Sequence, residues 1–189
     1  MTTSFKRTAM AGFTLIELLI VVIILAIISA IAIPQFSSAT SDAQQAALDA
    51  NLATVRNSLE QYRAQHTGNV YPGANAATAG TACTQAPPAP EGGVAAGTAG
   101  AMLNQLRYPT NAAGETCAVG DATNFRFGPY LRQGLPMEPI TNSNAVVVTT
   151  AGTPIAPAAA TGGWAYDTRS GQFIMNSNAE FNENPYSER

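Results

Sequence analysis

The longest regular pattern in the chain is an apolar run near its N-terminus. Residues 13–33 read FTLIELLIVVIILAIISAIAI, and only Thr14, Glu17 and Ser29 interrupt them with polar groups. About 20 apolar residues are enough for a helix to cross a bilayer. The run is long for the apolar part of a secretory signal peptide, and no A-x-A-type cleavage site follows it directly. The pattern therefore predicts a membrane-spanning helix that the protein retains.

Past Pro34 the pattern becomes one-sided. Apolar side chains recur at steps of four, three, four and three residues, at Leu48, Leu52, Val55, Leu59 and Tyr62. These steps place the side chains on one face of a helix. We expect the helix to end near His66, with Gly68 as a C-terminal cap. Pro34 removes a backbone hydrogen bond, so a kink or local melting is expected there.

The rest of the chain joins a loop-rich stretch to short β-type runs. Residues 69–100 are rich in Ala, Gly, Thr and Pro, which predicts loop rather than core, and 102–108 predict a short helix. Strands are expected at 145–150, 163–168 and 172–176, and the last two flank a hairpin turn. The predicted fold class is α+β: a long helix packed on a small antiparallel sheet of three or four strands. That packing would bury Leu52, Leu59, Trp164, Tyr166, Phe173 and Ile174.

Charge is scarce, and its distribution indicates topology. Charged residues make up 11% of the chain, and the net charge is −3, which gives no sign of nucleic-acid binding. Lys6 and Arg7 precede the apolar run, whereas the rest of the chain contains seven arginines and twelve acidic residues. Positive charge beside an apolar run holds that end in the cytoplasm. Residues beyond the helix are therefore expected to be exported.

The two cysteines, Cys83 and Cys117, fall in the part expected to be exported. A single pair in an oxidising compartment most simply forms one structural disulfide. Their spacing is far from the C-x-x-C of redox enzymes, and four thiolates for a zinc site are not present. No catalytic constellation, cofactor motif or metal-ligand cluster is visible, and His66 is expected to cap carbonyls at the helix end. An enzyme is therefore not predicted.

Glu17 is the residue that fits the membrane segment least. A charged carboxylate inside a bilayer costs several kcal/mol at the centre and less near the interface. We therefore expect a partner for Glu17, and the alternative is that its side chain extends to the lipid headgroups. The surrounding residues, Gly12-Phe13-Thr14-Leu15-Ile16-Glu17-Leu18, resemble the cleavage and methylation signature of type IV pilins and type II secretion pseudopilins.

This resemblance covers residues 12–36 and joins a basic leader, a Gly-Phe junction, a glutamate and an apolar run. It implies that a prepilin peptidase cuts between Gly12 and Phe13 and methylates the new amine of Phe13. It gives Glu17 the assembly role of the family's N-terminal glutamate, in which the carboxylate pairs with a neighbour's Phe13 amine and sets register. It also matches Pro34 to the family's helix-kinking proline.

The resemblance also implies a division of the chain. Residues 1–12 form the leader, 13–33 the transmembrane and assembly half of the helix, and 34–68 its amphipathic half. The head, 69–189, comprises a loop at 69–124 and a sheet at 125–189. The Tyr-Asp-x-x-Ser-Gly-x-Phe hairpin loosely resembles the sheet of pseudopilins, but the stretch that matches their calcium loop, 136–142, has one carboxylate. Calcium favours several oxygen ligands, so no metal site is predicted.

The function implied is that of a structural subunit of a type IV pilus-like filament, serving adhesion, motility or DNA uptake. The expected partners are further copies of the chain, the prepilin peptidase and an inner-membrane assembly platform. The precursor would cross the inner membrane once with its head in the periplasm, and the filament would then be extracellular. The alternatives are a type II secretion pseudopilin in a periplasmic pseudopilus and a monomeric membrane-anchored binding module.

Overall fold

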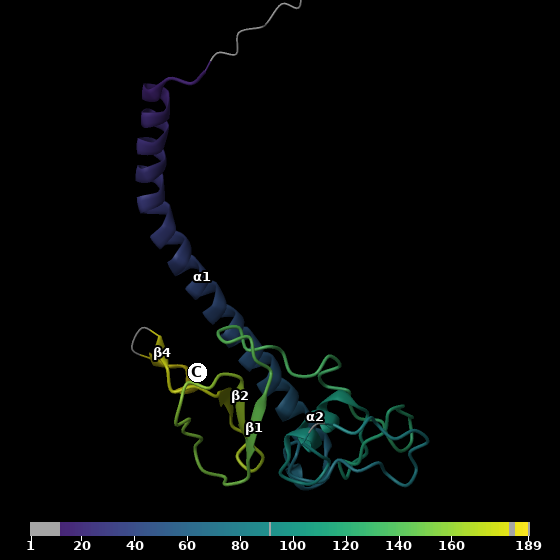
Figure 1. The fold of residues 1–189 in the computed structure, drawn as a ribbon. Coiled ribbons are helices and arrows are strands. Elements are labelled where there is room, and N and C mark those ends of the chain that lie inside the picture. The colour runs from purple at the N-terminus through teal and green to yellow at the C-terminus, as the bar shows by residue number, and fades with distance from the viewer. Residues whose placement is uncertain (1–11, 91, 182–183, 189) are drawn as a thin grey trace, which may run out of the picture. The chain divides into compact units, whose positions relative to one another are not determined.

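The computed structural model describes residues 12–90, 92–181 and 184–188, and it divides into two units, Met1–Ala43 and Gln44–Arg189. Lys6 and Arg7, on which the predicted topology depends, lie outside the described residues. The first element is helix α1 (Leu15–Gln65), drawn in purple to blue in Figure 1. In the first unit its large apolar side chains are exposed. This part of α1 is long and apolar enough to cross a membrane.

The C-terminal end of α1 agrees with the predicted one. The helix stops at Gln65, one residue before the predicted end at His66. Gly68 has φ 79° but lies inside the 3-10 turn η1 (Thr67–Asn69), beyond the extended His66, so it is not the direct cap of α1 that was predicted. Pro34 lies inside α1, and the helix continues on both sides of it. The kink expected at Pro34 stays a prediction.

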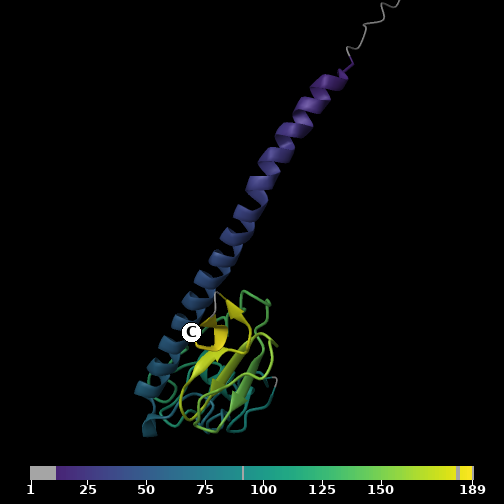
Figure 2. The ribbon, with the colours of Figure 1, turned by 90° about the vertical axis from the view of Figure 1, so that its left-hand side faces the viewer.

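The second unit packs the C-terminal part of α1 against a small sheet. The sheet contains β1 (Val146–Thr149), β2 (Trp164–Asp167) and β3 (Phe173–Met175) in that order. A second pair, β4 (Glu180–Phe181) and β5 (Asn184–Pro185), precedes the 3-10 turn η2 (Tyr186–Glu188). Figure 2 shows the strands lying along one side of the C-terminal part of α1. The predicted α+β class is confirmed.

The strand pairing differs in one respect from the prediction. Strands β2 and β3 form the expected antiparallel hairpin, with Tyr166 opposite Phe173. Strands β1 and β2 are parallel, with Val146 opposite Trp164, so the expectation of an antiparallel sheet was wrong for this pair. The reason is the connection, residues 150–163, which carries the chain back along β1 before β2 begins. Parallel neighbours need such a crossover, whereas a hairpin turn gives antiparallel ones.

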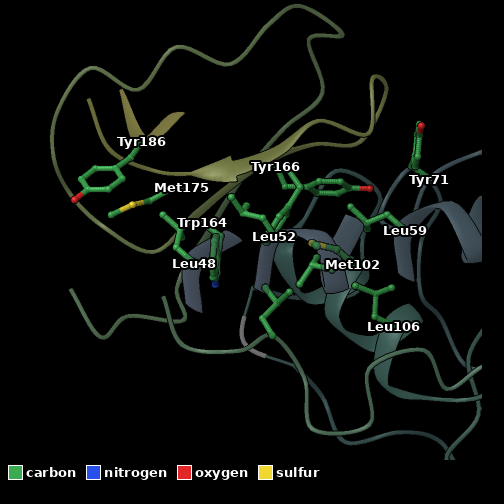
Figure 3. Packing of buried hydrophobic residues seen from close by; sticks show 13 residues of the cluster. Leu48, Leu52, Leu59, Tyr71, Met102, Leu106, Trp164, Tyr166, Met175 and Tyr186 are labelled. Carbon is green, nitrogen blue, oxygen red and sulfur yellow. The ribbon is translucent and has the colours of Figure 1, made fainter. Parts of the chain in front are cut away.

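The one-sided stripe of α1 forms the centre of the core, as predicted. Leu48, Leu52, Val55, Leu59 and Tyr62 are each at most 1% exposed. Opposite them lie side chains of the sheet and of α2 (Ala99–Arg107), including Trp164, Tyr166 and Met102 (Figure 3). Burying each large apolar side chain contributes about 1.5–3 kcal/mol. All six residues expected to be buried by helix–sheet packing are buried.

The Ala- and Gly-rich stretch after α1 is irregular but partly belongs to the core, which corrects its prediction as loop outside the core. Tyr71 is 8% exposed and joins the core cluster, and Ala77 is 2% exposed. The backbone is bonded across the head, with Thr116 N donating to Thr78 O at 3.0 Å. Tyr71 and these backbone bonds attach the stretch to the head, although its composition is that of a loop.

The predicted disulfide between Cys83 and Cys117 is present and links residues 34 apart in sequence. We expect the double substitution Cys83→Ala and Cys117→Ala to lower the free energy of unfolding by roughly 3–4 kcal/mol, because the open loop adds entropy to the unfolded chain. Thermal unfolding of the detergent-purified protein, before and after reduction, measures the effect. A midpoint equal to that of the oxidised wild type would contradict it.

Candidate functional site

The residues just before α1 form an unpacked junction. Gly12, Phe13 and Thr14 lie outside the helix, and all three are exposed. A side chain at Gly12 would meet nothing within 4 Å, and Phe13 is 90% exposed. The backbone between Gly12 and Phe13 is therefore free of side-chain packing from the described residues. Such a segment suits an extended fit into a protease site.

Thr14 and Glu17 cap the first turn of α1 together. The Thr14 N–H donates to Glu17 Oε2 at 2.8 Å, and the Thr14 hydroxyl donates to the same oxygen at 2.7 Å. In return, the Glu17 N–H donates to Thr14 Oγ1 at 3.2 Å. This reciprocal arrangement is a capping box, in which N-cap and third helical residue satisfy one another's backbone N–H groups. The T-x-x-E spacing was readable in the sequence, but the role of Thr14 was missed there.

The capping box prepares Glu17 for a second partner. Both bonds from Thr14 end on Oε2, so they leave Oε1 to accept from another group. A carboxylate is also favoured at a helix N-terminus, where the backbone dipole is positive. Part of the cost that a charged Glu17 would carry at a membrane edge is therefore offset by contacts within its own chain. The carboxylate lies in the turn that starts two residues after Gly12, close along the chain to the amine that cleavage there would create at Phe13.

The described residues offer structural roles for the histidine and the buried carboxylates of the head. His66 is buried, its Nδ1 lies 2.7 Å from Tyr62 O and its Nε2 lies 2.8 Å from Thr110 Oγ1. The predicted capping of a carbonyl is thus confirmed, and burial lowers the pKa of His66. Glu138 is fully buried and accepts from the N–H groups of Ile140 and Thr141 and from the Thr141 hydroxyl.

Glu138 is the one carboxylate of the 136–142 stretch, and its bonds organise that turn from within. Within the described ranges, no group of three or more His, Cys, Asp or Glu side chains is placed to hold a metal ion. The pairing that the sequence assigned to Glu17, its contact with a neighbour's amine, concerns a second subunit and stays a prediction.

Asp167 holds the crossover loop to the β2–β3 turn. It is fully buried and accepts five hydrogen bonds, from the Thr149 hydroxyl, the Gly152 and Arg169 N–H groups, and the N–H and hydroxyl of Ser170. Burial alone would raise the pKa of Asp167, but these bonds outweigh it and lower the pKa well below its usual value. The charged form of Asp167 therefore stabilises the folded head.

We expect Asp167→Asn to lower the free energy of unfolding by roughly 2–3 kcal/mol near neutral pH. The side-chain NH2 group of asparagine cannot accept hydrogen bonds, so some of the N–H and hydroxyl donors around position 167 would lose their acceptor. The folded pKa lies below the unfolded one, so the contribution of Asp167 is present above about pH 4 and is lost as the pH falls further. Thermal unfolding of both proteins from pH 7 to pH 3 should show the difference shrinking. Asp42→Asn, at an exposed carboxylate of α1, is the matched control. A pH-independent difference for Asp167→Asn would contradict this role.

Comparison with known proteins agrees with the geometry at the start of α1. A family model, the prokaryotic N-terminal methylation motif, matches residues 7–33. The chain is also similar to the type IV narrow pilus major component PilA5 of Thermus thermophilus, with 56% identity over 45 residues. That match covers 24% of this chain and 39% of the relative's length. No solved structure matches the chain.

The fold and the N-terminal site define a class: α+β proteins with a pilin-like arrangement of a long apolar helix and a small head sheet. Over its N-terminal segment the chain is similar to type IV pilins, through the prepilin methylation motif.

Proposed function

We propose that this chain is the precursor of a structural subunit of a type IV pilus. The observation that carries the proposal is the capping box of Thr14 and Glu17, which stands directly after an exposed Gly12–Phe13 junction and opens an unburied apolar helix. Prepilin peptidase cuts at that junction and methylates the amine of Phe13. The cut removes Lys6 and Arg7 and leaves one new amine at the membrane face.

Assembly then pairs charges between subunits. The Phe13 amine of one subunit meets the Oε1 side of Glu17 on its neighbour, while Oε2 stays bonded to Thr14. Inside a bundle of apolar helices an unpaired carboxylate is costly, and a misaligned neighbour leaves it unpaired. The pair therefore selects the register of the helices more than it adds stability. Before assembly the precursor crosses the inner membrane once, with its head in the periplasm.

We favour a surface pilus over a periplasmic pseudopilus for one reason. The relative that shares the N-terminal segment is named as a component of a narrow type IV pilus. The proposed partners are further copies of the chain, the prepilin peptidase and an inner-membrane assembly platform. Whether the pilus serves adhesion, motility or DNA uptake depends on the exposed surfaces of the head.

Immunogold electron microscopy of intact cells, with antibodies against the head, tests this function. A surface pilus predicts labelled fibres that shear from the cells and are lost when the prepilin peptidase is deleted. Label confined to the periplasm would instead indicate a pseudopilus. Protein that remains a membrane-bound monomer with the peptidase present would contradict the filament and indicate an anchored binding module.

A further inference from the structure

Among the described residues, strand β1 forms one edge of the three-stranded sheet and pairs with β2 alone. The carbonyl oxygens of Ala145 and Thr149 accept hydrogen bonds from the β2 side at 2.8 and 3.0 Å. Backbone groups alternate in direction along a strand, so those of Val146 and Val148 point away from β2. A free edge of β-branched residues is a template for a further extended segment. This edge is therefore suited to contact with another chain.

A groove of about 440 Å³ lies between α2 and the start of β1. Leu103, Leu135 and Val146 give it apolar walls, and Arg107 in the last turn of α2 adds a positive charge. Arg107 is exposed, and among the described residues that line the groove none is acidic. The groove is therefore complementary to a segment that carries an apolar side chain and a carboxylate close together.

Residues 118–121 present that chemistry on the surface of the same head. Val119 is 55% exposed, and Asp121, two residues further on, is exposed as well. The N–H groups of Asn124 and Thr123 both donate to Asp121 Oδ1 and lower the pKa of this carboxyl, so the exposed group is charged at neutral pH. Only Gly120 separates the two residues, in an exposed loop that bends at Ala118 and Val119. Because the two residues are exposed and so close along the chain, both can reach one groove.

We propose that, in the filament, the 118–121 segment of one subunit docks into the groove between α2 and β1 of a second copy of this chain. Val119 packs against Leu103 and Val146, and Asp121 pairs with Arg107. The proposal rests on the proposed function as a filament subunit. Because donor segment and acceptor groove are different surfaces, the contact is heterologous and continues as an open helical array rather than closing into a dimer. It aligns the heads, as Glu17 is proposed to align the helices.

A cross-linking experiment on whole filaments tests this contact. Full-length protein with Val119→Cys and Val146→Cys is expressed in place of the wild type, and sheared fibres are oxidised and run on a non-reducing gel. We expect a ladder of covalent multimers, because each subunit is donor to one neighbour and acceptor to another. Val119→Cys with Ala160→Cys, which places the second thiol on an exposed loop outside the groove, should give no ladder. Fibres of normal yield without a ladder from the first variant would overturn the docking.

A charge exchange covers the case in which the cysteine variant does not assemble. Arg107→Asp and Asp121→Arg should each lower fibre yield about two- to fivefold, the range expected for an exposed ion pair, and the double variant should restore it. Single variants that give the same fibre yield as the wild type would overturn the docking while leaving the filament function intact. A double variant that does not restore the yield would do the same. Absence of fibres from the wild type as well would overturn the proposed function and, with it, this contact.

Discussion

Replacing Glu17 with alanine is expected to abolish filaments while leaving the protein inserted in the membrane. The substitution makes the apolar run more hydrophobic, so insertion and the fold of the head should be unaffected. It removes the carboxylate that would pair with the Phe13 amine of a neighbour. Breaking a buried charge pair from one side leaves the other charge unpaired, which weakens association by more than about 100-fold per contact. Immunoblots of sheared fibres and of membranes measure the two outcomes separately.

Glu17→Gln is the matched control because it separates capping from charge. A glutamine amide oxygen can still accept from the Thr14 N–H, so the capping box is kept. It carries no charge for the amine. If the ion pair governs assembly, Glu17→Gln should lack filaments as completely as Glu17→Ala. Normal fibres from Glu17→Gln but not from Glu17→Ala would assign Glu17 a capping role only, and normal fibres from both would remove it from assembly.

The second large effect is expected in the turn between β2 and β3. Gly171 has φ 74°, and a Cβ added there would overlap ring carbons of Tyr71. The Tyr71 ring is held by its hydroxyl, which donates to Glu60 at 2.7 Å and accepts from Arg63 at 2.9 Å. Gly171→Ala must therefore displace a core side chain as well as strain the backbone. We expect a loss of roughly 2–5 kcal/mol in the free energy of unfolding, the sum of overpacking and backbone strain.

Two comparisons isolate the cause of the Gly171 effect. Gly93 has φ 79°, and a Cβ added there would meet nothing within 4 Å, so Gly93→Ala should cost only the backbone term of about 1 kcal/mol. In a Tyr71→Ala background, Gly171→Ala should fall to a similar cost, because the clashing ring is gone. Thermal unfolding of the detergent-purified variants measures each of these losses. Equal losses for Gly171→Ala with and without Tyr71 would contradict the steric explanation.

Much of this fold was predictable because its pattern is local. The steps of three and four from Leu48 to Tyr62 set the buried face of α1, and the Arg169-Ser170-Gly171 turn set the β2–β3 hairpin. Both rules depend only on residues close in sequence. The pairing of β1 with β2 depends on the path of residues 150–163, which has no periodicity to read, and so the parallel arrangement was missed.

The polar anchors were harder to predict than the apolar ones. Asp167 accepts hydrogen bonds from the Thr149 hydroxyl and the Gly152 N–H, 18 and 15 residues earlier in the chain, which only the folded head brings to it. Tyr71 lies in a stretch whose composition is that of a loop, and its partners on α1 lie 8 and 11 residues earlier. At the N-terminus the motif singled out Gly12, Phe13 and Glu17, whereas the bond between Thr14 and Glu17 came from the structure.

The most direct measurement is intact-mass and N-terminal peptide analysis of the protein from its native membranes or from sheared fibres. A processed filament subunit predicts a mature chain that begins at N-methylated Phe13, with residues 1–12 removed. A chain that still begins at Met1, or that is cut elsewhere, would contradict processing by a prepilin peptidase. Glu17 would then have no neighbouring amine of this kind to meet, and the chain would be better explained as a membrane-anchored binding module.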